Sequence, residues 1–107
     1  MESMRIHTTL GEHLRTMRET AGLTLREVAI NVNIDPSLLA KIERNQRQPT
    51  KLLIKNIALF FKIEERELLS EFLSDQIAYK ILDEKADLNV LKVAEKKVSY
   101  LKTLRNG

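Results

Sequence analysis

The sequence predicts an all-α protein, and three observations favour this fold class. Apolar residues recur every three or four positions through most of the chain, which is the spacing of one helix face. Thr9 with Glu12 and Thr24 with Glu27 each form a capping box, the residue pair that opens a helix. Three glycines and two prolines in 107 residues leave little room for long linkers. With 43% hydrophobic residues, a chain of this length can bury one modest core.

The first helix is predicted to begin after Thr9 and to end at Gly22, since glycine is the usual residue just beyond a helix C-terminus. Its apolar stripe consists of Leu10, Leu14 and Met17. The residues before it, 1–7, lack clear periodicity. They form either a frayed end or an arm that reaches a partner through Arg5 and His7.

Two short helical patterns and a tight turn occupy residues 24–50. The first pattern ends near Val32, and its apolar face consists of Leu25, Val28, Ala29 and Val32. Asn33 tolerates the left-handed backbone, so it can turn the chain. Asp35 then supplies an N-cap, and Pro36 a first-turn proline, for a second helix that runs to about Arg44. Two helices joined by a short turn indicate a helix-turn-helix unit.

Residues 23–49, LTLREVAINVNIDPSLLAKIERNQRQP, closely resemble the Cro and phage-repressor type of helix-turn-helix family, also called lambda repressor-like. The family is common among small bacterial and phage regulators, and the match extends from Leu10 to about Leu69. The positions that carry the resemblance are Ala29, Ile34, Ile42, Glu43, Arg44 and Pro49. Asn45 replaces the glycine of the family's I-E-R-G signature, which asparagine can imitate by accepting a positive φ.

Two further helices complete the five-helix DNA-binding domain that the resemblance implies, over residues 8–73. Thr50 can cap the fourth helix, which is apolar on nearly every face and is therefore predicted to be the centre of the core. Its apolar residues are Leu52, Leu53, Ile54, Ile57, Ala58, Phe60 and Phe61. The fifth pattern runs from Glu64 to Leu73, and its apolar residues are Leu68, Leu69, Phe72 and Leu73.

Residues 74–107 are predicted to form a helical extension beyond that domain. A short apolar face, 77–82, belongs either to a separate helix that begins near Ser74 or to a continuation of the fifth helix. Asp87 then caps a longer helix that extends to about Arg105. Its apolar stripe, predicted to hold a homodimer together, consists of Leu91, Ala94, Val98 and Leu101. Packing within the chain and a contact with another protein are the alternatives.

The charge distribution favours nucleic acid as a partner more strongly than the net charge does. The net charge is only +3, but residues 41–62 hold six basic side chains against the single acid Glu43. DNA phosphates would favour that surface, whereas a solvated basic face is the alternative. The tail sequence LKVAEKKVSYLK adds a second, looser resemblance, to small regulators encoded beside DNA methyltransferases in restriction-modification systems.

The family resemblance implies that the second helix of the unit, the recognition helix, enters the major groove of DNA. The base-contacting residues that it implies are Ser37, Leu38, Ala40, Lys41 and Arg47. Leu38 is equally compatible with the core. The phosphate-contacting residues are Arg15, Arg26, Arg44, Gln46 and Lys51. Arg18 and Glu43 are implied to form a structural ion pair. Leu25 and Pro36 depart from the family, which often has a phosphate-binding glutamine and a base-contacting polar residue there.

Several functional classes lack the residues that they need. There is no cysteine, and therefore neither a disulfide, a thiolate metal site nor a cysteine nucleophile. His7 and His13 have no carboxylate at a zinc-motif spacing and are expected at the surface. No glycine-rich phosphate loop or nucleophile elbow occurs, so we expect neither an enzyme nor a cofactor. No apolar stretch reaches the roughly 20 residues of a membrane span, which favours a cytoplasmic protein.

These expectations combine into a sequence-specific transcriptional regulator, a dimeric repressor or autoregulator. A twofold dimer would place two recognition helices about 34 Å apart, on an inverted repeat with half-sites roughly ten base pairs or a multiple apart. The alternative is an antitoxin or other protein-binding module that uses the C-terminal helix, with DNA binding secondary.

Overall fold

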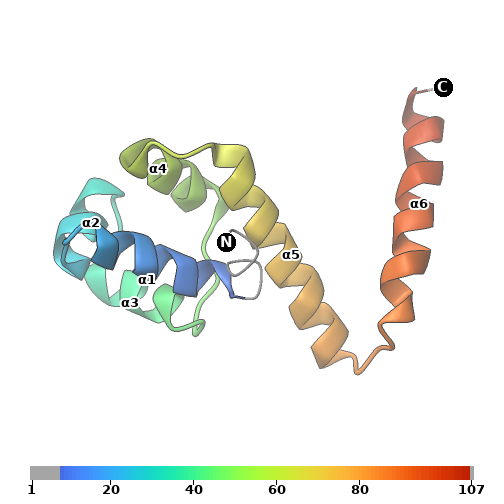
Figure 1. Ribbon diagram of the computed structural model, residues 1–107, viewed down its shortest axis with the longest axis horizontal. Coiled ribbons are helices and arrows are strands. Elements are labelled where there is room, and N and C mark those ends of the chain that lie inside the picture. Colours follow the sequence, from blue (N-terminus) through green and yellow to red (C-terminus); the bar gives the residue numbers. More distant parts are fainter. Residues whose placement is uncertain (1–7, 107) are drawn as a thin grey trace. The chain divides into compact units, whose positions relative to one another are not determined.

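A computed structural model describes residues 8–106, and this range holds six helices and no strand. The helices are α1 (Leu10–Thr20), α2 (Leu25–Asn31), α3 (Pro36–Glu43), α4 (Lys51–Phe61), α5 (Glu65–Asp83) and α6 (Asn89–Asn106), labelled in Figure 1. The prediction of an all-α protein is confirmed. The suggested arm residues Arg5 and His7 lie outside the described range.

Side-chain caps begin the helices where the sequence predicts them. Both capping boxes form, at α1 between Thr9 and Glu12 and at α2 between Thr24 and Glu27. The remaining caps involve single acceptors: Asp35 accepts from the Ser37 N–H at α3, and the Thr50 hydroxyl accepts from the Leu53 N–H at α4. Each of these bonds satisfies a backbone N–H that has no partner within the helix, so each fixes where the helix begins.

A residue with left-handed backbone follows five of the six helices. The residues are Gly22, Asn33, Asn45, Lys62 and Lys85, with φ between 53° and 71°. The predictions for Gly22, Asn33 and Asn45 are confirmed. In each case the next N–H turns back to a carbonyl of the last helical turn, as from Leu23 to Arg18 and from Ile63 to Ala58. Because these bonds close the last turn, the helices end sharply.

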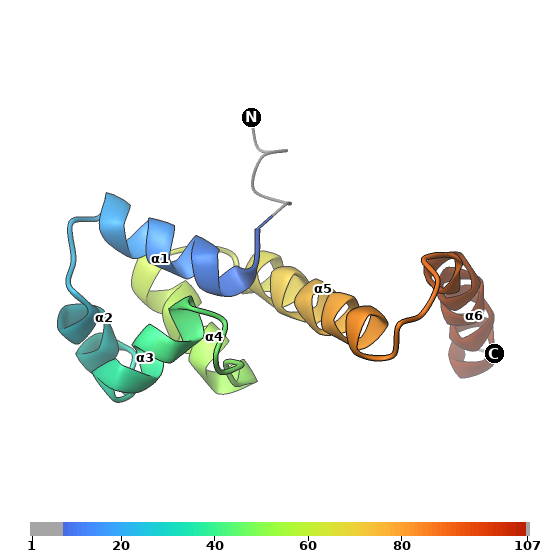
Figure 2. The same cartoon turned by 90° about the horizontal axis from the view of Figure 1, so that it is seen from below.

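The chain divides into two compact units, residues 1–75 and residues 76–107. The first unit holds the core, to which α1 to α5 all contribute, and Figures 1 and 2 show α1 to α4 gathered beside the first part of α5. The buried apolar side chains are Leu10, Leu14, Val28, Ala29, Val32, Leu39, Ile42, Leu53, Ile54, Ile57, Ala58, Leu68 and Phe72.

The prediction that α4 contributes to the centre of the core is confirmed by four buried residues, but Leu52, counted among its apolar core residues, lies on an exposed side of the helix. Leu52 and Leu59 are 67% and 68% exposed, and they lie seven residues apart on one outward side of the helix. The opposite side carries the buried residues Leu53, Ile54, Ile57 and Ala58. An apolar sequence shows that a helix can be buried all round, but the number of neighbouring elements decides how many faces are covered.

A single helix spans the region that the sequence left open, since α5 runs without a break from Glu65 to Asp83. The division into units falls within it. In the second unit, α6 has no buried residue. Among the described residues, no helix has both the length and the apolar character needed to cross a membrane.

Two polar contacts fasten α5 to α1 inside the first unit. The Leu10 N–H donates to Asp75 Oδ2 at 2.8 Å, and His13 Nδ1 lies 2.8 Å from Glu71 Oε2. The expectation that His13 is a surface residue is therefore wrong, because its side chain is only 10% exposed. Neither contact has a local sequence signal, since the partners lie about sixty residues apart in the chain.

Candidate nucleic-acid interface

The turn between α2 and α3 has a rigid geometry. Asn33 takes a φ of 64°, its N–H donates to the Ile30 carbonyl at 3.3 Å, and the Ile34 N–H donates to the Ala29 carbonyl at 3.0 Å. Ala29 is fully buried beneath this turn. Figure 2 shows α2 and α3 side by side below α1. The turn thus fixes α3 against α2 and leaves one side of α3 toward solvent.

The exposed side of α3 carries three polar residues at helical spacing. Ser37, Lys41 and Arg44 lie four and three residues apart and are all exposed, so they share one face. Two other residues that the family resemblance implies to contact bases are less exposed than these three. Ala40 is half-buried, and Leu38 is half-buried against the core. The buried side of the helix consists of Leu39, Ile42 and Glu43.

The hydroxyl group of Ser37 already donates a hydrogen bond to the carboxylate of Asp35. Asp35 Oδ2 accepts both this hydroxyl and the Ser37 N–H, the latter at 2.9 Å. These two hydrogen bonds, the hydroxyl first, lower the pKa of Asp35. In this arrangement the Ser37 oxygen remains available as an acceptor. It would accept from a cytosine or adenine amino group more readily than it would donate to guanine.

The loop after α3 is shaped by Asn45 and Pro49. Asn45 takes a φ of 64°, and its side-chain oxygen accepts the Thr9 hydroxyl at 2.8 Å, which fastens the loop to the start of α1. Pro49 is buried at the other end of the loop. Between these anchors Gln46 and Arg47 are exposed, next to the end of the recognition helix.

Most of the basic residues predicted to contact DNA form no ion pair with an acidic side chain. Among residues 8–106 the ion pairs involve none of the exposed residues Arg26, Lys41, Arg44, Arg47 and Lys51. Arg15 differs from them, since its Nε lies 3.0 Å from Glu19 Oε2. Unpaired cations attract phosphates more strongly than cations already neutralised by a neighbouring carboxylate. The free cations belong to α2, to α3 with its exit loop, and to the start of α4.

An ion pair in the interior connects α1 to α3. Arg18 donates from Nε to Glu43 Oε2 at 2.8 Å and from Nη2 to Glu43 Oε1 at 3.0 Å, and its Nη1 donates to the Leu23 carbonyl. The side chains are 13% and 4% exposed. The hydrogen bond to Glu43 raises the pKa of Arg18. Each of the three guanidinium nitrogens therefore donates a hydrogen bond within the fold, which makes Arg18 a structural residue.

A glycine lets the same two helices approach closely. A Cβ atom on Gly11 would lie 2.2 Å from the Ile42 carbonyl oxygen and 2.8 Å from Asn45 Oδ1, both shorter than real contacts. Gly11 was not predicted from the sequence to have a role. The signal was available, because a glycine inside a helix costs about 1 kcal/mol and usually has a packing reason.

The residues predicted to form the dimer contact belong to the other unit. Leu91, Ala94, Val98 and Leu101 all lie on α6, and all are exposed. Among the described residues, no group of three or more histidine, aspartate or glutamate side chains is arranged to hold a metal ion.

Comparisons with known proteins agree with this geometry. Residues 11–71 match the sequence profile of a family described as "Helix-turn-helix domain". One similar solved structure is the restriction-modification controller protein C.AhdI from Aeromonas hydrophila, with 34% identity and a TM-score of 0.52. The similarity covers 55% of this chain and 89% of that protein.

A second similar structure is the clp gene regulator ClgR from Corynebacterium glutamicum. It has 25% identity and a TM-score of 0.53, and the similarity covers 82% of this chain and 88% of that protein. No curated protein sequence gives a significant match.

Proposed function

This chain belongs to the helix-turn-helix domain family, and we propose that it regulates transcription by binding DNA through α3. The observation that supports the proposal is the exposed polar face of α3 with its basic exit loop. The ion pair of Arg18 and Glu43 fixes the opposite, buried side of this helix. An enzymatic role has no support from the family match or from either similar regulator.

We assign two kinds of DNA contact to α3, its exit loop and the basic residues around them. The residues that contact base edges in the major groove are Ser37, Leu38, Ala40, Lys41 and Arg47. The residues that contact phosphates are Arg15, Arg26, Arg44, Gln46 and Lys51. Lys41 can donate to guanine O6 or N7 from the middle of the helix, whereas Pro36 has no side-chain donor or acceptor. Much of the specificity therefore comes from Lys41, Arg47 and the shape of the DNA.

We further propose that the active species is a homodimer that binds an inverted repeat. Support comes from α6, an 18-residue helix whose apolar residues Leu91, Val98 and Leu101 are 43% to 51% exposed. Apolar surface of this extent favours a partner. A twofold axis gives half-sites roughly ten base pairs or a multiple apart.

The similarity to C.AhdI supports a role like that of a controller protein, a small regulator associated with a restriction-modification system. Repression or autoregulation follows if the inverted repeat overlaps a promoter, because the bound dimer then blocks polymerase.

Selection of bound duplexes from a random DNA library tests the proposal. Full-length protein near physiological salt should enrich an inverted repeat. Lys41→Ala should relax the preference at one position of each half-site, whereas Lys51→Ala should weaken all sequences about equally and reduce the salt slope by about one. Unchanged selectivity in Lys41→Ala contradicts the role of that residue. Failure to enrich any motif contradicts sequence-specific regulation.

The exposed face of α6 also favours a second candidate function, that of an antitoxin or other protein-binding module. In that case a different protein covers α6 and DNA binding is secondary. A purified chain that stays monomeric at high concentration, but forms a defined complex with one protein from its source, would support this function over the dimeric regulator.

A further inference from the structure

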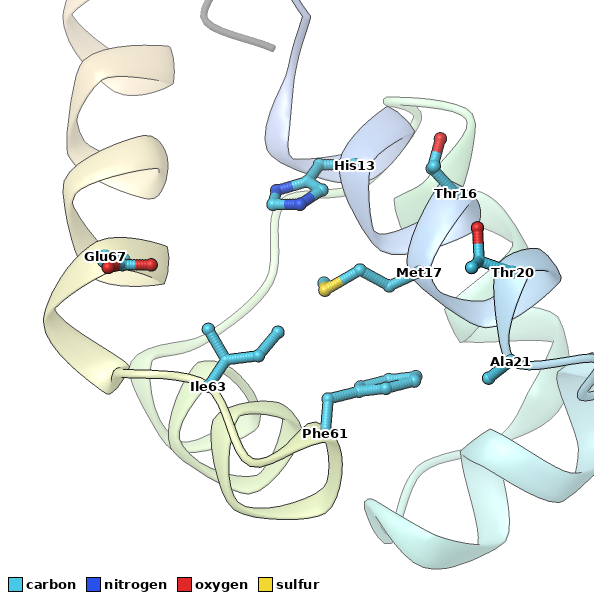
Figure 3. Close-up of a pocket in the computed structure, with 8 residues that line it drawn as sticks. All are labelled: His13, Thr16, Met17, Thr20, Ala21, Phe61, Ile63 and Glu67. Atoms are coloured by element: carbon cyan, nitrogen blue, oxygen red, sulfur yellow. The ribbon is translucent and has the colours of Figure 1, made fainter. Parts of the chain in front are cut away.

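A pocket of about 490 Å³ lies in the first unit, between the second half of α1, the end of α4 and the first turn of α5. It is formed away from the exposed face of α3, and no residue assigned to DNA contact lines it. Figure 3 shows its apolar side chains, Met17, Phe61 and Ile63, between the helices. The volume falls in the range of small-molecule sites in proteins.

The lining combines an apolar part with a polar rim. Phe61 is kept in place by an edge-to-face contact with Phe60, whose ring centroid lies 4.9 Å away. Thr16 and Thr20 line the α1 side, with the Thr16 hydroxyl donating to the Glu12 carbonyl, and the imidazole of His13 and the carboxylate of Glu67 complete the rim (Figure 3). Such a lining fits a molecule with an apolar body and one polar head group.

The electrostatics of the rim select the charge of that head group. Two helices end at the pocket, α1 at Thr20 and α4 at Phe61, and each C-terminus carries a partial negative charge. The carboxylate of Glu67 adds a full negative charge and has no ion-pair partner among residues 8–106. No lysine or arginine lines the pocket.

The remaining charged groups near the pocket do not reverse this sign. His13 turns its Nδ1 to Glu71, so any positive charge on the imidazole is matched by that carboxylate. Lys62 precedes Ile63 in the chain but is exposed and does not line the pocket. The partial positive charge at the start of α5 faces Glu65 and Glu67 in its own first turn.

We infer that this pocket binds a small amphipathic cation, a molecule with an aromatic or aliphatic body and one protonated amine. The body lies against Met17, Phe61 and Ile63, and the ammonium group lies at the carboxylate of Glu67. The inference does not depend on DNA binding, because the pocket and the α3 face share no residue.

Two probes with the same apolar body and opposite head groups test the charge preference. 4-Phenylbutylamine is a cation near neutral pH, and 4-phenylbutyrate is an anion. Each is titrated into the full-length, isotope-labelled protein while amide resonances are followed by NMR. The amine should bind at least tenfold more tightly than the acid and should shift the resonances of Met17 and Ile63. Equal affinities, or shifts that avoid the pocket, overturn the inference.

Matched variants distinguish binding of the amine in this pocket from its general attraction to acidic residues on the surface. Glu67→Gln should weaken the amine at least fivefold, whereas Glu65→Gln, which removes the same charge outside the pocket, should change it less than twofold. Ala21→Phe fills the pocket from the end of α1 and should abolish saturable binding of the amine. Equal losses in Glu65→Gln and Glu67→Gln, or full binding by a folded Ala21→Phe variant, contradict the inference.

Discussion

At the scale of single residues, the position of the recognition helix depends on one carboxylate. Glu43 is the only charged residue in the buried set of the described chain, and both of its oxygens accept hydrogen bonds from Arg18. Its burial would be costly without that partner, since an isolated charge loses its hydration in the interior. The arginine therefore stabilises α3 indirectly, by keeping the carboxylate on its inner face compatible with the core.

Replacing Arg18 should reveal this dependence. Arg18→Ala leaves Glu43 buried without a counter-charge, so the free energy of unfolding should fall by about 3 kcal/mol in chemical denaturation. Arg15→Ala is a matched control, because it removes an exposed pair with Glu19 that contributes about 0.5 kcal/mol or less. Similar losses in the two variants would show that the inner pair contributes no more than a surface one.

Asp75 makes stability depend on pH. Burial raises its pKa above the ordinary value of 3.8, and the hydrogen bond from the Leu10 N–H only partly opposes this. The folded state then binds more protons than the unfolded state. The contribution of Asp75 is thus fully present below pH 3.8 and is lost as the pH rises through the folded pKa.

Comparing the Asp75→Asn variant with the wild type should show the pH range over which this contribution to stability is lost. The wild type should lose stability relative to Asp75→Asn as the pH rises above about 4, measured by thermal unfolding between pH 3 and 7. Asp35→Asn should give the opposite slope, because hydrogen bonds from Ser37 lower the pKa of Asp35 in the folded state. A difference for Asp75→Asn that is constant over this range would contradict the raised pKa.

At the scale of elements, α1 and α3 behave as one structural piece. The absence of a side chain at Gly11 allows the two helices to touch through the Ile42 carbonyl, and the ion pair connects the opposite end of α1 to Glu43, the next residue of α3. The Thr9 hydroxyl reaches the loop after α3. A change in either helix should therefore be felt at the DNA-contacting face.

Gly11→Ala is the smallest change that forces these helices apart. Its new methyl group cannot fit within 2.2 Å of a backbone oxygen, so overpacking should outweigh the gain in helix propensity and lower the free energy of unfolding by about 2 kcal/mol. Ser70→Ala, at an exposed position of α5, should change it by no more than about 0.5 kcal/mol. A wild-type stability for Gly11→Ala in urea denaturation would mean that the helices can separate at little cost.

At the scale of the whole molecule, local chemistry was predictable from the sequence and distant pairing was not. The capping boxes, the turn at Asn33 and the start of α3 at Asp35 each depend on neighbours within a few residues. The cap that Asp75 provides for α1 joins positions 65 residues apart, so no short pattern indicates it. The exposed side of α4 was missed for the same reason, because neighbours distant in sequence determine which of its apolar faces are covered.

The candidate interface shows the same difference between features predictable from local sequence and features that depend on the fold. Most of its residues lie between Arg26 and Lys51, with Arg15 farther away in α1, and the family resemblance implies their roles. The hydrogen bond that occupies the Ser37 hydroxyl, the half-buried position of Leu38 and the neutralisation of Arg15 all depend on side-chain geometry. Of these residues, the sequence indicated an alternative role only for Leu38, which is equally compatible with the core.

A charge placed on the α6 stripe tests the proposed assembly. Leu101→Glu should convert the dimer into a monomer in light scattering, because a carboxylate would be buried in an apolar contact. It should also weaken binding to a double half-site at least tenfold, with little effect on a single half-site. Lys102→Glu, beside the stripe, should stay dimeric. A dimeric Leu101→Glu variant would contradict the role of this stripe.

The absence of any buried residue on α6 has a consequence for timing in the cell. If two copies must meet before the operator is filled, the amount of active regulator rises with the square of the chain concentration while the protein is scarce. A newly introduced gene would then pass through a period of unrepressed transcription, whose length is set by the rate of synthesis and by the strength of the α6 contact. Mutations on α6 would move that delay without altering which sequence is recognised.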